Sequence, residues 1–267
     1  MDVFGSDALI GDYRLSDHGL MLCTFNYQDV YELGYTVEPT KYFLGKNPKP
    51  LYVGSKPNGV LELTLTVIQN ECMTGKNFFT TNECREILGK LTGYQGYKRM
   101  YVNKQFVFEN LYYNVHVTNA EYEKSGDKVV GIRFTMECDS PFAWVDYERN
   151  CETTEANQVI HMMNNSDLFY DYTLPVMVIK SDSDIEVLDI KNVTDNNRTT
   201  RIEGIHANEI ITIDSTLGKI TSTMNTNFSE KFNYKFPKLV HGDNQMFISQ
   251  PLHVTYKLVL PRKIGVM

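Results

Sequence analysis

Residues 110–138 read NLYYNVHVTNAEYEKSGDKVVGIRFTMEC, and this stretch decides the fold class. Apolar and polar residues alternate on both sides of a polar, glycine-containing segment at 124–128. Such alternation is typical of half-buried strands, and a polar segment with a glycine favours a turn between them. The stretch therefore predicts one long antiparallel hairpin. Its apolar stripes are formed by Leu111, Tyr113, Val115 and Val117 on one strand and by Val130, Ile132, Phe134 and Met136 on the other.

The flanking sequence repeats the two-residue period of strands. Residues 60–68 alternate in the same way, and several short apolar stretches separated by turn residues follow between 176 and 260. One helix is expected at 81–92, where Thr80 and Glu83 fit a capping box ahead of an apolar stripe. Such a stripe is more typical of a helix packed on its own sheet than of a partner-binding helix. The pattern predicts a mostly β protein whose second half is a β-sandwich.

A chain of 267 residues predicts two domains or one large domain. Residues 145–157 carry several acids and few large aliphatic side chains, which favours a linker. We therefore expect an N-terminal domain at 1–145, a linker at 146–157 and a C-terminal β-sandwich domain at 158–267. The 26 Lys and Arg residues against 33 Asp and Glu give a net charge of −7, which disfavours a general nucleic-acid binder.

The sequence offers no pattern for a catalytic or cofactor site. Its six histidines lack a paired metal-ligand spacing, and its five cysteines are odd in number and contain no C-x-x-C pair. Glycine-rich phosphate loops and a nucleophile elbow are also missing from the sequence. We therefore expect no catalytic residue, no metal, no cofactor and a protein that is not an enzyme. The apolar stretches are too short to cross a bilayer, so we expect no membrane insertion.

A basic segment at 38–59 stands out in this acidic chain. It contains four prolines and three glycines, and its four lysines face a single acid, Glu38. This composition predicts an extended or looped segment. Such a segment can bind an acidic partner, although a merely solvated loop fits the composition at least as well. The candidate partner-binding residues are Lys41, Lys46, Lys49 and Lys56.

Aromatic residues are in surplus, because 17 Tyr, 14 Phe and one Trp make up 12% of the chain. Strand cores, protein interfaces and sugar-stacking surfaces all use aromatic faces, so these three interpretations stay open. The cluster that suits a sugar platform is Phe169, Tyr170 and Tyr172. Exposure of these side chains to solvent would favour sugar binding, and burial of all three would exclude it.

The order of these pieces resembles the distal tail protein family of long-tailed phages and prophages. In the first half, the resemblance rests on the strand at 60–68, the helix, the hairpin and the closing residues IRFTMECDSPFA at 132–143, which are its most specific part. In the second half, it rests on shorter matches at 174–176, 190–194, 209–214 and 239–244.

The resemblance implies a tail-tube-like N-terminal β domain that forms a homohexameric ring, and a C-terminal sandwich of galectin-like or carbohydrate-module-like fold. The ring would connect the tail tube protein to the tail hub or tail-associated protein, with DNA only as passing cargo in its channel. A receptor-binding protein is a further candidate partner, although the first half shows no large insertion to hold one. The implied location is the virion tail tip or baseplate, assembled in the cytoplasm of the bacterial host.

Three hypotheses follow from the sequence. The leading one is a structural phage tail-tip or baseplate protein, in which the two apolar stripes of the hairpin form the ring interface. The alternative is a carbohydrate-binding module that contributes to host-surface attachment. The third is a glycosidase acting on the cell wall, which would require two carboxylates about 5–10 Å apart in a cleft.

Overall fold

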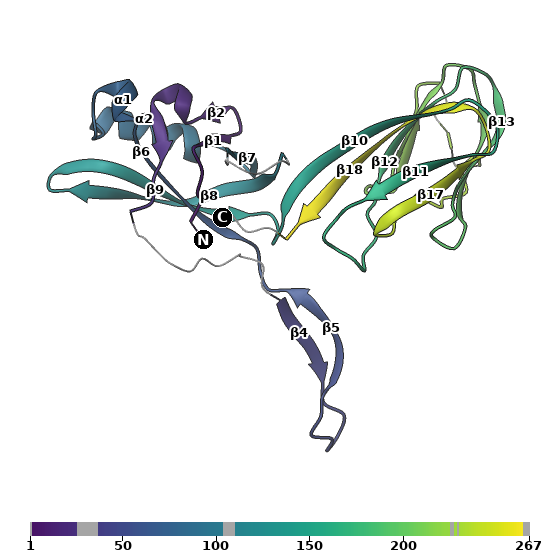
Figure 1. The fold of residues 1–267 in the computed structure, drawn as a ribbon, viewed down its shortest axis with the longest axis horizontal. Coiled ribbons are helices and arrows are strands. Elements are labelled where there is room, and N and C mark those ends of the chain that lie inside the picture. Colours follow the sequence, from purple (N-terminus) through teal and green to yellow (C-terminus); the bar gives the residue numbers. More distant parts are fainter. Residues whose placement is uncertain (1, 26–36, 104–109, 225–226, 229, 264–267) are drawn as a thin grey trace. The chain divides into compact units, whose positions relative to one another are not determined.

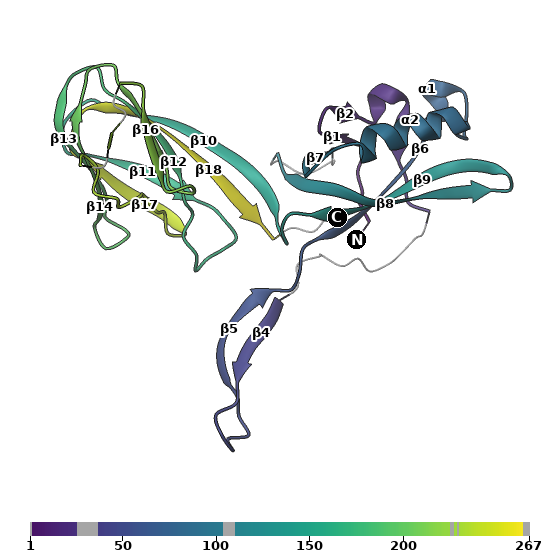
Figure 2. The same cartoon turned by 180° about the vertical axis from the view of Figure 1, so that it is seen from behind.

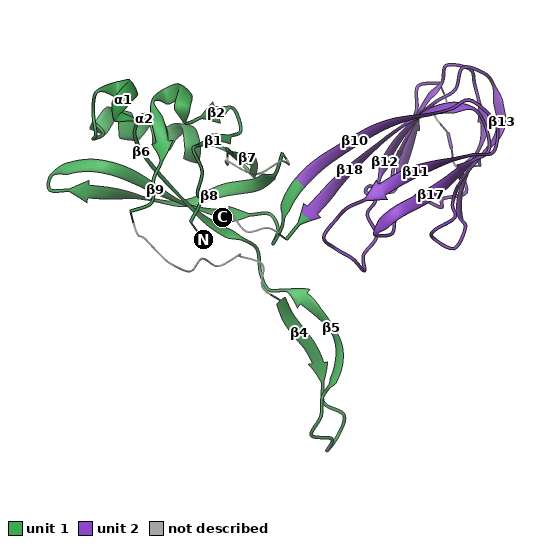
Figure 3. Cartoon of the chain, viewed as in Figure 1, with its two compact units in different colours: residues 1–144, 262–267 green, residues 145–261 purple. Residues whose placement is uncertain are grey.

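The computed structural model divides the chain into two compact units, which Figure 3 colours separately. The structure describes all residues except 1, 26–36, 104–109, 225–226, 229 and 264–267. The N-terminal unit comprises residues 1–144 and 262–267, and the C-terminal unit comprises residues 145–261. Both units consist mainly of antiparallel strands, so the expectation of a mostly β protein is confirmed (Figure 1).

Within the described residues of the N-terminal unit, seven strands pair in the order β2-β1-β7-β8-β9-β6-β3. All six pairings between neighbouring strands are antiparallel. The strands are β1 (Asp7–Ile10), β2 (Tyr13–Arg14), β3 (Leu20–Leu22), β6 (Glu62–Gln69), β7 (Lys98–Asn103), β8 (Tyr112–Ser125) and β9 (Lys128–Cys138).

The long hairpin expected at 110–138 is confirmed as β8 and β9. Its register pairs Val115 with Cys138 near the base and Ser125 with Lys128 at the turn. Gly126 adopts a positive φ of 64° in that turn, a conformation that glycine reaches without steric cost. The hairpin therefore has the length and turn that the sequence predicts.

The expected helix is also confirmed, as α2 (Thr81–Thr92), which lies over one face of the sheet (Figure 2). Both halves of the capping box between Thr80 and Glu83 are present. The helix buries Cys84, Ile87 and Leu91 in the core of its own unit, so its apolar stripe packs on its own sheet. Two short helical turns, η1 (Ser16–His18) and α1 (Glu71–Thr74), complete the helical elements of the described residues.

The basic segment forms a hairpin of its own. Strands β4 (Val37–Tyr42) and β5 (Leu51–Pro57) pair antiparallel as a separate two-stranded sheet, which the sequence predicted only as an extended or looped segment (Figure 1). The register shifts between Thr40 and Lys41, which marks a β-bulge. We call residues 37–57 the arm.

The C-terminal unit contains two antiparallel sheets, as expected for a β-sandwich. One has the order β16-β15-β12-β18-β10 and the other the order β11-β17-β13-β14, and buried side chains from both sheets form one core. The strands are β10 (Ala143–Thr153), β11 (Gln158–Asn164), β12 (Val176–Lys180), β13 (Ile185–Asn192), β14 (Arg198–Ile205), β15 (Ile210–Asp214), β16 (Lys219–Ser222), β17 (Gly242–Ile248) and β18 (Leu252–Arg262).

The structure differs from the expectation at the linker, 146–157. Most of this segment belongs to strand β10. Its acidic side chains occupy the exposed face of the strand, while Tyr147 and Cys151 pack against the core. Thr153 is buried, and its hydroxyl accepts a hydrogen bond from the Leu252 amide at 2.9 Å. The inward-facing residues of this strand are an aromatic residue, a cysteine and a threonine rather than large aliphatic residues. The sequence pattern therefore did not indicate a strand here.

We expect the Glu83→Gln variant to lose stability at neutral pH and to resemble the wild type in acid. A hydrogen bond from Lys76, followed by bonds from the Thr80 amide and hydroxyl, lowers the pKa of Glu83 to about 2. A lowered folded-state pKa stabilises the protein above the unfolded-state pKa near 4.5, and that contribution disappears as the pH falls toward 2. Urea titrations followed by fluorescence of Trp144, the only tryptophan, measure the difference.

The exposed Glu86 on the same helix provides the control. Glu86→Gln should leave the unfolding free energy nearly unchanged across this pH range, because the side chain is exposed on the helix surface. A Glu83→Gln effect that persists undiminished at pH 2 would contradict the proposed role of the carboxylate.

Candidate interaction surfaces

The structure places seven of the eight predicted ring-interface side chains in the core of the N-terminal unit or packed against it, and Val130 is the exception. Five of the eight are buried and three are partly buried. The sheet's own core therefore uses this face. Its side chains are not available to a neighbouring chain, although the sequence analysis expected them to form the ring interface. The buried residues are Tyr113, Val115, Ile132, Phe134 and Met136, and the partly buried ones are Leu111, Val117 and Val130.

The opposite side of the same strands presents polar residues, and we call it the outer face. Directly paired residues on adjacent strands point to the same side, so Thr64 with Thr135 and Thr66 with Arg133 share it. It carries four glutamates and one arginine, and the arginine forms an ion pair with Glu123. The outer face is therefore polar and acidic. Its polar residues include Glu62, Thr64, Thr66, His116, Asn119, Glu121, Glu123, Arg133, Thr135 and Glu137.

The outer face also borders a polar hollow of about 320 Å³. Its lining includes Thr64, Glu121 and Arg133, together with Asp2 and the ring of Phe25. The hollow thus continues the polar, mainly acidic character of this side of the sheet.

The arm exposes an unusual amount of apolar surface. No residue between 37 and 57 is buried. Six large apolar side chains around its tip are between 54% and 70% exposed, although monomeric proteins rarely expose contiguous apolar patches. A two-stranded hairpin by itself is only marginally stable in water. The arm therefore has the properties of a contact element that another chain covers, and its apolar residues are Tyr42, Phe43, Leu44, Leu51, Tyr52 and Val53.

The four lysines predicted to bind a partner all lie on the arm. Lys41, Lys46, Lys49 and Lys56 are exposed, and only Lys56 approaches an acid, with its Nζ 3.7 Å from Glu38 Oε2. Residues 1–145 hold 14 basic and 17 acidic residues, a net charge of −3. The arm contributes +3 to this sum, so the remainder carries −6. The arm is basic and the part of the chain that bears it is acidic.

The predicted sugar-platform residues lie together on one loop of the C-terminal unit. Phe169, Tyr170 and Tyr172 are all exposed, which is the arrangement that favours sugar binding over a role in the core. The Tyr172 hydroxyl donates to Asp195 Oδ1 at 3.0 Å, and this hydrogen bond raises the pKa of Tyr172. The Phe169 ring meets the imidazole of His241 edge to face, with centroids 4.4 Å apart.

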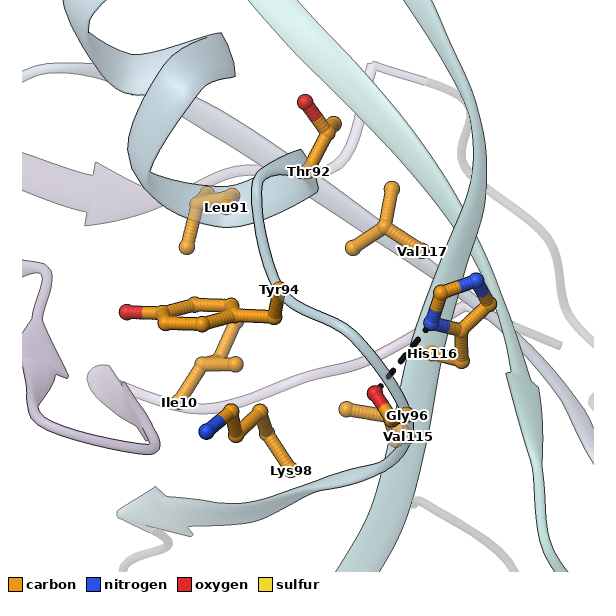
Figure 4. Close-up of a pocket in the computed structure, with 9 residues that line it drawn as sticks. All are labelled: Ile10, Leu91, Thr92, Tyr94, Gly96, Lys98, Val115, His116 and Val117. Carbon is orange, nitrogen blue, oxygen red and sulfur yellow. Dashed lines mark hydrogen bonds between the residues drawn. The ribbon is translucent and has the colours of Figure 1, made fainter.

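A small cavity lies beside the C-terminal end of α2 (Figure 4). Its volume of about 10 Å³ suits one water molecule. The polar groups around it make structural contacts: the Tyr94 hydroxyl donates to Asp12 at 2.8 Å and lowers the pKa of that carboxyl. His116 Nδ1 lies 3.3 Å from the Gly96 carbonyl oxygen (Figure 4). This cavity therefore has no room for a substrate.

The part of the chain that the structure describes shows neither a metal site nor a membrane-spanning helix. No group of three or more His, Cys, Asp or Glu side chains in this part of the chain could hold a metal ion. None of its helices is long and apolar enough to cross a membrane.

The apolar tip of the arm is the functional feature that the sequence analysis missed. Prolines, glycines and lysines dominate the segment's composition and indicated a solvated loop. The missed signal is the pair of triplets Tyr42-Phe43-Leu44 and Leu51-Tyr52-Val53 on either side of the turn. Two apolar triplets flanking a turn rich in glycine and proline are typical of a hairpin.

Comparison with known proteins identifies two matching family models. Residues 4–140 match the model described as phage tail protein N-terminal domain, and residues 142–258 match the model described as phage tail C-terminal domain. Among curated proteins, none matches the sequence.

Solved structures of phage proteins share the fold. The Dit protein (gp 19.1) of phage SPP1 is similar with a TM-score of 0.68 and 11% identity, over 95% of this chain and 98% of that chain. A chain of the phage P2 baseplate in its activated conformation with Ca is similar with a TM-score of 0.52 and 7% identity, over 94% of each chain. The expected resemblance to distal tail proteins is thus confirmed for the fold.

Phe134→Ala should lower the unfolding free energy of the N-terminal unit by about 3–5 kcal/mol, because it empties a fully buried aromatic site. Tyr122→Ala, on the other strand of the same hairpin, should change it by less than about 0.5 kcal/mol, because that ring is exposed. Urea unfolding followed by Trp144 fluorescence measures both. A Phe134→Ala variant of unchanged stability would show that this side chain is not part of the core.

Proposed function

The chain belongs to the phage tail protein family, because the N-terminal family model covers more than half of it, and we propose that it forms a hexameric ring at the tail tip or baseplate. The ring connects the tail tube protein to the tail hub and leaves a channel for DNA. Its role is structural, with no bond made or broken. The fold shared with SPP1 Dit, whose structure is described as a paradigm of a hub adsorption apparatus, supports this assignment.

The arm is the observation that carries the proposal. Its exposed apolar tip needs a covering surface, and its charge of +3 opposes the −6 of the remaining N-terminal residues. A neighbouring copy of this chain supplies that acidic surface. Contact of the arm with the next copy is heterologous, because a different patch is used on each partner. Heterologous contacts that close by rotation generate rings.

The outer face of the sheet supplies the wall of the channel. It offers hydroxyl and carboxylate groups, and its one cation is already paired with Glu123. DNA phosphates are attracted by unpaired lysines and arginines and repelled by carboxylates. A wall of this composition lets DNA pass without binding it. The C-terminal sandwich is then left to meet other tail proteins or a receptor-binding protein.

The triple variant Phe43→Ser, Leu44→Ser and Tyr52→Ser should stay folded and lose assembly. These side chains are exposed, so the substitution removes contact area without disturbing a core. Light scattering should give six times the chain mass of 30.8 kDa for the wild type and a single chain for the variant. Negative-stain images should show rings with a central hole for the wild type only.

The matched control replaces exposed apolar residues of the C-terminal unit, in the variant Tyr234→Ser, Leu217→Ser and Val259→Ser. We expect this control to assemble like the wild type. Assembly of the arm variant at wild-type mass would show that the arm is not the ring contact, and a wild type of single-chain mass would reject a ring formed by this chain alone.

Reversing the charge of the outer face should make the ring bind DNA. In the variant Glu62→Lys, Glu121→Lys and Glu137→Lys, three carboxylates become three ammonium groups, so the net charge of each subunit's channel wall rises by six. Gel-shift titrations at low salt should give at least about tenfold tighter DNA binding than the wild type, and the binding should weaken steeply with added salt.

The control places the same three reversals on the C-terminal unit, as Glu148→Lys, Glu152→Lys and Glu186→Lys, all at exposed positions. We expect a smaller gain in DNA affinity, because these charges are not on the outer face proposed as the channel wall. Equal gains in both variants would reject the outer face as the channel wall.

A further inference from the structure

We propose that the C-terminal unit binds a neutral glycan at one end of its sandwich, on the faces of Phe169, Tyr170 and Tyr172. Three loops meet there: residues 165–175 after β11, residues 193–197 between β13 and β14, and residues 235–241 before β17. The contacts described above for Tyr172 and Phe169 join the first loop to the other two. Lys238 Nζ also lies 5.3 Å from the centroid of the Tyr172 ring.

Three buried asparagines hold these loops in place. The Asn164 side chain donates to the carbonyl oxygens of Leu239 and Val240 at 3.2 and 3.1 Å. The Asn192 side chain donates to the Lys238 carbonyl at 2.9 Å and to the side-chain oxygen of Asn244 at the same distance. The loops are therefore fixed before any ligand arrives, and a preformed site loses little entropy on binding.

The aromatic side chains themselves point to a ligand. Tyr170 is fully exposed, and Phe169 and Tyr172 are 60% and 49% exposed, although the loops beneath them are anchored by buried groups. A rigid loop that presents three aromatic side chains to water has no folding advantage, because burial of these rings would stabilise the unit. The rings are therefore available to stack on an apolar face of a bound molecule.

The neighbouring polar groups favour a sugar over a protein. The core of a protein interface is depleted in charged residues, whereas here a carboxylate and an ammonium group lie beside the Tyr172 ring. A pyranose combines an apolar C–H face with a rim of hydroxyl groups. The C–H face fits the rings, and the hydroxyl groups fit the oxygens of Asp195 and the Lys238 ammonium.

The local charge favours a neutral sugar over an anionic one. The three loops and their adjoining residues carry four carboxylates and three cations, Lys235, Lys238 and Arg198. Arg198 donates from its Nε to the Phe236 carbonyl at 3.0 Å. A polymer rich in phosphate or uronic acid would therefore meet a small excess of negative charge at this surface. The carboxylates are those of Asp167, Asp171, Asp195 and Asp243.

Native affinity electrophoresis of the full chain tests this inference. The gels contain a neutral β-glucan, a galactan or a mannan, and polygalacturonate serves as the anionic probe. We expect at least one neutral polysaccharide to retard the wild type and polygalacturonate to leave it unretarded. Tyr170→Ala and Tyr172→Ala should each weaken retention about tenfold, because each removes one stacking face. Tyr172→Phe, which keeps the ring, should weaken it less than Tyr172→Ala.

The matched control is Tyr234→Ala, which removes another exposed tyrosine of the same unit, outside the three loops. It should be retained like the wild type. Retention by no neutral probe, retention by polygalacturonate only, or undiminished retention of the two alanine variants would each overturn the inference. Light scattering of the same variants reports ring assembly separately. Loss of assembly in Tyr170→Ala or Tyr172→Ala would make this surface a protein contact and would equally overturn glycan binding.

Discussion

The N-terminal unit depends on the two-residue alternation of side chains along β8, β9 and β6. Ile132, Phe134 and Met136 point into the core, while Arg133, Thr135 and Glu137 point to the outer face. A slip of one residue in this register would place Arg133 in the core and Phe134 in water. The burial of the aromatic and aliphatic stripe therefore also fixes which polar groups the outer face presents, so one constraint sets both the stability of the sheet and the chemistry of its surface.

In the arm, by contrast, neither face of the strands is buried. Its strands pair only with each other, and neither face finds a layer to bury its apolar side chains. Helix α2 shows what such a layer provides, because its three buried side chains join the sheet in one core. Stability thus resides in the sheet and helix, whereas the apolar side chains of the arm add nothing to the core of their own unit. This separation is the physical reason to expect that substitutions at the arm tip leave the fold intact.

Local patterns in the sequence were sufficient for the hairpin and for α2, because both combine strong periodicity with specific turn or capping residues. The same periodicity could not say what covers the apolar stripe. From the sequence alone, Phe134 could be a core residue or an interface residue. Only the positions of α2 and β6 show that it is a core residue. Strand β10 was hidden because Tyr147 and Cys151 replace the expected aliphatic side chains. The aromatic loop was located correctly, but only the structure reveals that its rings are exposed.

The two units have separate hydrophobic cores, so the properties of each can change without unfolding the other. This matters for a glycan site of the kind proposed here, because stacking on a few aromatic rings gives only modest affinity for one sugar chain. A hexameric ring of the kind proposed would carry six such sites on one particle. Linked sites raise the effective affinity by about 10²–10⁴ when geometry allows simultaneous binding. Ring formation by the N-terminal unit would therefore turn weak contacts of the C-terminal unit into durable attachment, without any tighter individual site.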